Sequence, residues 1–238
     1  MPVGQNSIGR WWVEGHNFGM DDDSEFSPQN KRRYRSRTEA LLLRVDDHFY
    51  ETSEAYEEWD NPHRNIAPSE EEYSRVTNPD RFRIVTARAL AWERALSGYE
   101  GATVRRPKSD LNWIVGPRFK IDRSSIIYPQ RRGSMPLVFG FSVSSAELDA
   151  DTCSVGAGSP PFLLGKIPDC ACDACDSGSE TLIERLDKWV LSVVDGSLII
   201  EVSSGVLKLS TEFGTEESHT GELIGYSGEL EAVAWANR

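Results

Sequence analysis

The 238-residue sequence has no run of the roughly 18 consecutive apolar residues that a membrane-spanning helix needs. Its first segment, Met1 to Gly19, also lacks the succession of charged, apolar and small residues found in secretory signal peptides. We therefore expect a cytoplasmic protein with no membrane partner. The composition, with 39% hydrophobic and 27% charged residues, is that of a globular chain that can bury a core without disulfides.

The common nucleotide-binding and hydrolase motifs are also missing. The sequence contains no P-loop, no H-E-x-x-H and no G-x-S-x-G, and no glycine-rich loop stands between a strand and a helix. We therefore expect no nucleotide cofactor. Zinc-dependent nucleobase deaminases combine Pro-C-x-x-C with an upstream H-x-E or C-x-E. None of the four histidines nor Cys153 is followed by x-Glu, which argues against that class of enzyme.

Basic residues are fewer than acidic ones. The chain has 26 lysines and arginines against 38 aspartates and glutamates, for a net charge of −12. Nucleic-acid phosphates and anionic lipids repel such a surface, so we expect no nucleic-acid partner. An acidic surface would suit a protein that masks a basic partner, for example by neutralising a toxin. The sequence otherwise leaves the partner open between an unknown protein and a small molecule.

Three segments have clear helical patterns. A serine followed by proline favours a helix from about 28 to 50. Asn-Pro opens a second helix over 79–97, whose apolar residues recur every three or four positions. A third helix over 178–194 follows a Ser177–Glu180 capping box and has the same apolar spacing. All three patterns predict helices with one buried face.

Branched and aromatic residues bounded by glycine, proline or serine predict five strands, at 118–128, 136–144, 162–167, 197–202 and 206–213. The small, Gly- and Pro-rich residues 145–161 are expected to form a loop. The resulting fold class is α+β, a mainly antiparallel sheet with three to four packed helices. We expect residues 28–238 to form a single compact domain after a loosely ordered N-terminal segment, 1–27.

Cysteine is scarce but concentrated. Three of the four cysteines, Cys170, Cys172 and Cys175, fall in the box Pro168-Asp-Cys-Ala-Cys-Asp-Ala-Cys-Asp176, between a predicted strand and a predicted helix. The C-x-x-C spacing allows a tight turn to direct two sulfurs at one point, as in many zinc sites, and Cys170 could add a third ligand. Disulfides are disfavoured in the cytoplasm. A zinc site, a reactive thiol pair and a metal-free turn remain three alternatives.

The charges around the box favour a cation. The following helix start would stabilise a thiolate, whereas Asp169, Asp173 and Asp176 would repel one unless a cation sits among them. Zinc would resolve this conflict. The fourth ligand is unknown, and the candidates are Cys153, His48, His63, His219 or an adjacent aspartate. A filled fourth position would suit a structural site and an open one would suit catalysis.

The string PDCACDACDSGSETLIERLD resembles a family of uncharacterised proteins of high-GC Gram-positive bacteria, in which a Pro-Asp-Cys-Gly-Cys-Asp-Ala-Cys-Asp-Ser-Gly-Ser box precedes a helix. The upstream string EEYSRVTNPDRFRIVTARALAW, residues 71–92, is similar to the same family, so the resemblance covers about 65–238. Ala171 stands where the family has glycine, which raises the question of whether this turn needs a positive φ. The resemblance implies a domain extent and no activity.

These observations predict a cytoplasmic protein whose C-x-C-x-x-C box forms a structural zinc or thiol site that supports a binding surface. One alternative is a zinc- or thiol-dependent enzyme that uses the same box. Another is a metal-free interaction or toxin-neutralising protein. The sequence alone does not decide whether the protein is an enzyme.

Overall fold

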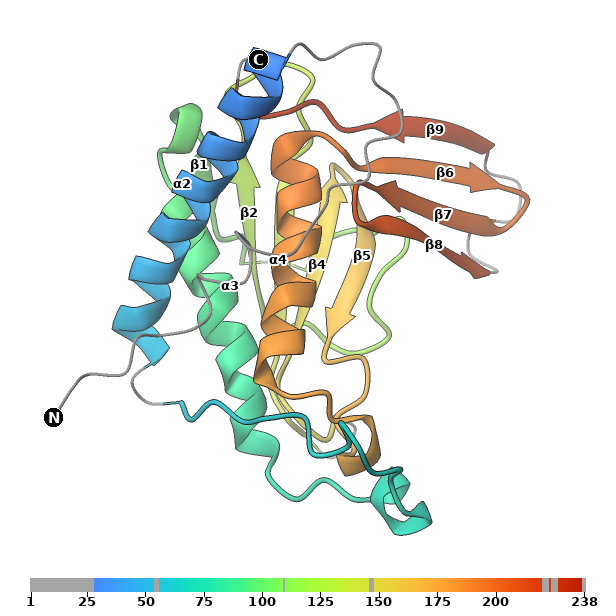
Figure 1. Cartoon of the computed structure of the whole chain (residues 1–238). Helices are drawn as coiled ribbons and strands as arrows, with labels where there is room; N and C mark the ends of the chain where they lie inside the picture. Colours follow the sequence, from blue (N-terminus) through green and yellow to red (C-terminus); the bar gives the residue numbers. More distant parts are fainter. Residues whose placement is uncertain are drawn as a thin grey trace, which may run out of the picture.

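In the described part of the chain, three α-helices lie against a five-stranded sheet, and a smaller sheet extends beyond the end of the last helix (Figure 1). The structure is a computed structural model that describes residues 28–53, 56–108, 110–145, 148–219, 223 and 227–236. The N-terminal segment 1–27 lies outside the described residues. The predicted α+β class is confirmed, and no described helix has the length and apolar character to cross a bilayer.

The predicted helices are confirmed, with their bounds at α2 (Pro28–Ser53), α3 (Arg83–Leu96) and α4 (Ser179–Asp195). A 3-10 turn, η3 (Pro79–Phe82), forms the start of the predicted 79–97 helix. Both α3 and α4 pack on the five-stranded sheet, and α2 packs on α3. Their apolar stripes explain this packing, because residues such as Trp92 and Leu186 are fully buried. Shorter 3-10 turns are η2 (Glu70–Ser74), η4 (Tyr99–Gly101) and η5 (Asp173–Cys175).

The larger sheet is an antiparallel meander in chain order, made of β1 (Thr103–Arg105), β2 (Arg123–Tyr128), β3 (Leu137–Ser142), β4 (Thr152–Gly158) and β5 (Pro161–Ile167). One face of β3 and β4 meets the helices through residues such as Phe139 and Val155. The opposite face is covered by the connection before β2, because a Cβ at Gly140 would meet Ile121. Every residue of β3 is therefore buried.

The prediction of a loop at 145–161 is wrong, because this range contains β4, which pairs with β3 on one side and β5 on the other. Its residues, Thr-Cys-Ser-Val-Gly-Ala-Gly, are small because large groups pack on them. A Cβ at Gly156 would overlap the ring of Trp113, which lies half-buried on that face. A glycine-rich stretch usually indicates a loop, whereas here Gly156 allows a close approach within a strand.

The smaller sheet has the order β8-β7-β6-β9 and is also antiparallel. Its strands are β6 (Ile199–Ser203), β7 (Val206–Thr211), β8 (Gly214–His219) and β9 (Ser227–Glu231). The predicted pairing of the 197–202 and 206–213 segments is confirmed. On one face, Ile200, Val202, Leu207 and Leu209 are buried and join the main core. The two edge strands, β8 and β9, are exposed throughout.

A buried ion network joins the three helices. The guanidinium of Arg88 on α3 is 1% exposed and makes two hydrogen bonds to the Asp187 carboxylate on α4, at 3.0 and 2.6 Å. It also contacts Asp46 on α2 at 2.6 Å, and the Trp92 indole N–H donates to Asp187 at 2.5 Å. The network therefore ties the middle of α4 to α3 and α2.

Candidate metal centre

The three cysteines lie in the short connection between β5 and α4. That connection starts after Ile167, ends at Ser179 and contains a single 3-10 turn, η5. Cys172 precedes the turn and Cys175 ends it, so the turn carries the chain back toward Cys170. The box lies at the N-terminal end of α4, opposite the end where the four-stranded sheet begins (Figure 1).

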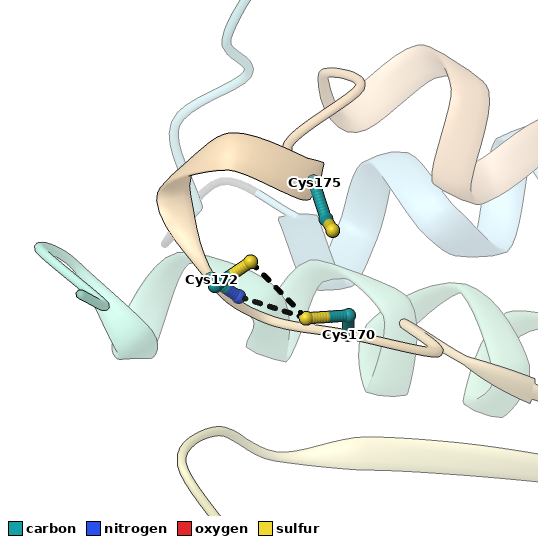
Figure 2. A group of neighbouring side chains, drawn as sticks. All are labelled: Cys170, Cys172 and Cys175. Carbon is teal, nitrogen blue, oxygen red and sulfur yellow. Dashed lines mark hydrogen bonds between the residues drawn. The ribbon is translucent and has the colours of Figure 1, made fainter. Parts of the chain in front are cut away.

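The three sulfur atoms converge, as the sequence predicted. Figure 2 shows the side chains directed toward a common point, and the three sulfurs all lie within 4.8 Å of one another. The Sγ atoms of Cys170 and Cys172 are 3.2 Å apart, and none of the cysteines forms a disulfide. A tetrahedral zinc ion with Zn–S bonds of about 2.3 Å separates its sulfurs by about 3.8 Å. The cluster therefore needs only small side-chain adjustments to surround such an ion.

Asp173 is the principal anchor of the turn. Its carboxylate accepts hydrogen bonds from Arg75 Nε at 2.7 Å, and from the Thr77 N–H and hydroxyl at 2.9 and 2.5 Å. The backbone N–H of Asp173 donates to the Arg75 carbonyl, and His63 Nε2 lies 3.1 Å from the Asp173 carbonyl oxygen. Burial raises the pKa of the Asp173 carboxyl, but the bonds from Arg75 and Thr77 outweigh burial and lower the pKa to about 2.

Asp176 occupies the place that the sequence assigned to a thiolate, at the start of α4. Its carboxylate accepts hydrogen bonds from the Trp59 indole N–H at 2.8 Å and from the Gly178 N–H at 3.0 Å. The Arg81 guanidinium contacts the same carboxylate at 2.9 Å and lies over the Trp59 ring. Asp176 is therefore the anion at the start of α4, and the backbone N–H groups that help to lower the pKa of Cys172 are those of Ala174 and Cys175 in η5.

The predicted Ser177–Glu180 capping box is also wrong. The N-cap residue is Gly178, with a φ of 84°, and α4 begins one residue later. A Cβ at Gly178 would lie 2.7 Å from the Asn61 nitrogen and 3.1 Å from the Trp59 carbonyl oxygen. The glycine is needed both for its left-handed conformation and for this close approach. Ala171, by contrast, does not have a positive φ, so its replacement of glycine costs the turn nothing there.

Each aspartate of the box is neutralised by an arginine. Arg185 pairs with Asp169, Arg75 with Asp173 and Arg81 with Asp176. The carboxylates do have cations among them, as expected, but these cations are arginines. The sulfurs are therefore the groups that would bind a metal ion at this site.

The thiols interact strongly with one another. Burial raises the pKa of Cys172, but hydrogen bonds from the other two thiols and from the Cys175 N–H hold it below its ordinary value. The hydrogen bond between Cys175 and Cys172, together with burial, raises the pKa of Cys175 to about 12. The cluster thus favours one thiolate next to a thiol that retains its proton. A zinc ion would have to displace that proton.

The structure does not bring the other candidate ligands to the sulfurs. Among the described residues, the three cysteines are the only group of histidine, cysteine or acidic side chains close enough together to share a metal ion. Cys153 is fully buried in β4, where burial raises its pKa and keeps it a thiol. His48 lies on α2 beside Glu51, and His219 ends β8. His63 is near the box, but its ring contacts the Asp173 carbonyl.

Local patterns in the sequence did not reveal four of the residues that hold the box in place, Trp59, Arg75, Thr77 and Arg81, and His63 was named only as a candidate ligand. Trp59 and His63 precede η2, and the other three follow it. One signal was available, because the 71–92 string that resembles the cysteine-box family contains Arg75, Thr77 and Arg81. The two strings that resemble one family are thus in direct contact in space.

Searches of curated proteins and of solved structures gave no match. A family model described as a family of unknown function, DUF6226, matches residues 45–234. This range includes the last third of α2, both sheets, the segment from Trp59 to Arg81 and the whole cysteine box. The chain therefore belongs to this family of unknown function, DUF6226.

Proposed function

We propose that Cys170, Cys172 and Cys175 bind one zinc ion as thiolates, and that this centre supports a binding surface at the N-terminal end of α4. The observation that carries the proposal is the convergence of three sulfurs within 4.8 Å. Sulfur is a preferred zinc ligand, and the distances are close to those of a tetrahedral thiolate site. Because the nearby aspartates are already paired with arginines, the sulfurs are the groups that are available to bind the ion.

The metal would have a structural role in this arrangement. The box connects the end of β5 to the start of α4, and it contacts the segment around Trp59 and Arg75 through hydrogen bonds across about a hundred residues. Cys170 and Cys175 are exposed, so apolar packing holds the outer side of the box only weakly. A zinc ion would add strong bonds where the hydrophobic core is thin.

The metal content of the full chain tests this proposal. Protein purified with a phosphine reductant and without chelator should contain about one equivalent of zinc, and Cys172→Ser should lose it. If free zinc stands at about 1,000 times its dissociation constant, binding contributes about 4 kcal/mol of stability. For a chain of this length, chelation should then lower Tm by roughly 8–16 °C.

Cys153→Ala is the matched control, because it removes a buried thiol that is outside the cluster. It should lower stability through lost packing while keeping one equivalent of zinc. Full metal content in Cys172→Ser, or no metal in the wild type, would contradict the proposal. Thiol titration against pH would then separate a redox pair from a metal-free turn.

A second candidate function is binding of a basic protein through the four-stranded sheet. One row of residues crosses all four strands in register on the exposed face, namely Glu217, Lys208, Glu201 and Glu229. Glu201 pairs with Lys208, and the two outer glutamates are exposed. The row thus presents excess negative charge on a flat surface with exposed edge strands. Positive surfaces would be attracted to it.

Charge reversal tests this second function. The double variant Glu217→Lys/Glu229→Lys should weaken binding of a lysine-rich peptide, measured by calorimetry at low salt. The matched control is Glu57→Lys/Glu58→Lys, which changes the net charge equally at exposed positions away from the sheet. Equal weakening by both variants would show a non-specific effect of net charge and would contradict a dedicated surface.

A further inference from the structure

The three cysteines are embedded in the protein on one side only. Cys172 is 7% exposed and lies against the core, whereas Cys170 and Cys175 are exposed. A metal ion held by all three would therefore have protein behind it and solvent in front. Three sulfur ligands leave one position of a tetrahedral ion unfilled, and the exposure of Cys170 and Cys175 gives solvent a route to it.

No histidine, aspartate or glutamate side chain among the described residues joins the three sulfurs in a group that could share one metal ion. The three neighbouring aspartates are each paired with an arginine. His63 Nε2 contacts the Asp173 carbonyl at 3.1 Å and lies 3.6 Å from Glu72, whereas its Nδ1 is buried without a hydrogen-bond partner. Neither His63 nitrogen belongs to the sulfur cluster, and recruiting an aspartate would break the ion pairs that anchor the turn.

We propose that the zinc ion keeps its fourth coordination position open on the solvent side, where it binds an external imidazole nitrogen. This inference rests on the proposed zinc site. Three thiolates give a divalent ion a net charge of −1, and the chain itself carries −12. A neutral nitrogen donor therefore faces less repulsion than a carboxylate or a second thiolate. Imidazole is among the donors that zinc prefers in proteins, which identifies the ligand class.

The donor would be either the histidine side chain of a partner protein or a small imidazole compound. Both present the same nitrogen to the metal, so free imidazole is a suitable probe for the site. A histidine of this chain from outside the described residues is the main competing occupant. The experiment has to separate that internal ligand from an external one.

Cobalt substitution gives a direct readout of the fourth ligand. Co²⁺ added to the reduced, metal-free full chain should produce the near-ultraviolet thiolate bands and the intense visible bands of a tetrahedral thiolate site. Addition of imidazole should shift the visible bands in a saturable way. Acetate at the same concentration and ionic strength should leave them unchanged. The reductant must be a phosphine, since a thiol would itself occupy the open position.

Two variants locate the response. Cys153→Ala should keep the full imidazole shift, because Cys153 lies outside the cluster. Because His63 also contacts the turn, its test is the response to imidazole: His63→Gln should still bind cobalt and should show the same imidazole shift as the wild type. Cobalt bands that respond to imidazole in His63→Gln but not in the wild type would identify His63 as the fourth ligand and would overturn the open position.

The outcomes separate this inference from the proposal on which it rests. A cobalt site with thiolate bands that do not respond to imidazole would overturn the open position and leave the zinc site intact. A response to acetate equal to that to imidazole would overturn the preference for a nitrogen donor. A complete lack of thiolate bands would instead overturn the zinc site, and the inference would fail with it. For a histidine from a partner, a histidine-containing peptide should give the same shift as imidazole, and a peptide with alanine in its place should give none.

Discussion

The two ends of α4 are held in place by different kinds of interaction. At its N-terminal end, the cysteine box is fixed by ion pairs and side-chain-to-backbone hydrogen bonds, with Asp173 and Asp176 at the centre. At its C-terminal end, the four-stranded sheet is fixed by strand pairing and by apolar residues such as Leu207 and Ile200. The first end depends on particular groups, whereas the second depends on buried area.

The difference has a direct consequence for how each end should respond to change. Hydrogen bonds and metal–ligand bonds each depend on one particular atom, so replacing a single atom at the box should lower the free energy of unfolding measurably. The sheet should tolerate polar substitutions on its exposed face. It should lose stability when a buried apolar side chain is shortened. The centre of α4, where Arg88 meets Asp187, supports both ends.

The largest effect is expected at this shared centre. Asp187→Ala would leave the Arg88 guanidinium buried without its main partner, which costs about 3–5 kcal/mol of unfolding free energy. Urea unfolding measures this loss. Glu184→Ala, which removes a partly exposed ion pair on the same helix, should change stability by less than about 0.5 kcal/mol. Equal effects of the two variants would show that the buried network is unimportant.

A slightly smaller effect is expected at the sheet end. Leu207→Ala removes a side chain that is 2% exposed, and should cost about 2–5 kcal/mol. Because the sheet lies at the opposite end of α4 from the box, the zinc content should stay at one equivalent per chain. Loss of metal from this variant would show that the two ends are not independent.

At the box end, the expected effect depends on pH. Asp173 has a pKa of about 2 in the folded chain, below its unfolded value of about 3.9. A lowered pKa means that the ionised carboxylate stabilises the fold, fully above about pH 4 and decreasingly as pH falls toward 2. Asp173→Asn should therefore be less stable than the wild type at neutral pH, with the difference shrinking over that range.

The pH comparison should be made in the presence of chelator, so that metal release does not contribute. Unfolding free energies of the wild type and Asp173→Asn, followed by urea titration at each pH, give the difference directly. A stability difference that stays constant from pH 6 to pH 2 would contradict the assigned role of the ionised carboxylate.

The smallest effect is expected on the exposed face of the sheet. Glu217→Gln removes one charge from an exposed strand and should change the unfolding free energy by less than about 0.5 kcal/mol. A larger loss would mean that the charge row contributes to folding, and the contrast between the two ends would then be weaker than described.

The sequence predicted the helices well because their apolar residues recur at helical spacing. It also predicted the convergence of Cys170, Cys172 and Cys175, because those residues are close in the chain. It failed on β4, whose small residues are explained only by Trp113 packing on Gly156. These packing partners are distant in the chain, so no local pattern could identify them.

Local patterns could not predict the contacts that support the box for a related reason. Arg75 and Asp173 are separated by 98 residues, and a pairing between them has no periodic signal. A local rule predicted a capping box at Ser177 and Glu180, whereas the N-cap is Gly178, where the chain at Asn61 approaches closely. Local spacing thus identified the three cysteines of the candidate site, and tertiary contacts determined what surrounds them.

X-ray absorption at the zinc edge, on the full chain purified with a phosphine reductant, tests the central claim most directly. The account predicts three sulfur neighbours at about 2.3 Å and one lighter neighbour, oxygen or nitrogen, at about 2.0–2.1 Å. Cys172→Ser should lose this spectrum together with the metal. Zinc surrounded only by oxygen and nitrogen, or protein that contains no zinc, would contradict the claim that Cys170, Cys172 and Cys175 form a metal centre.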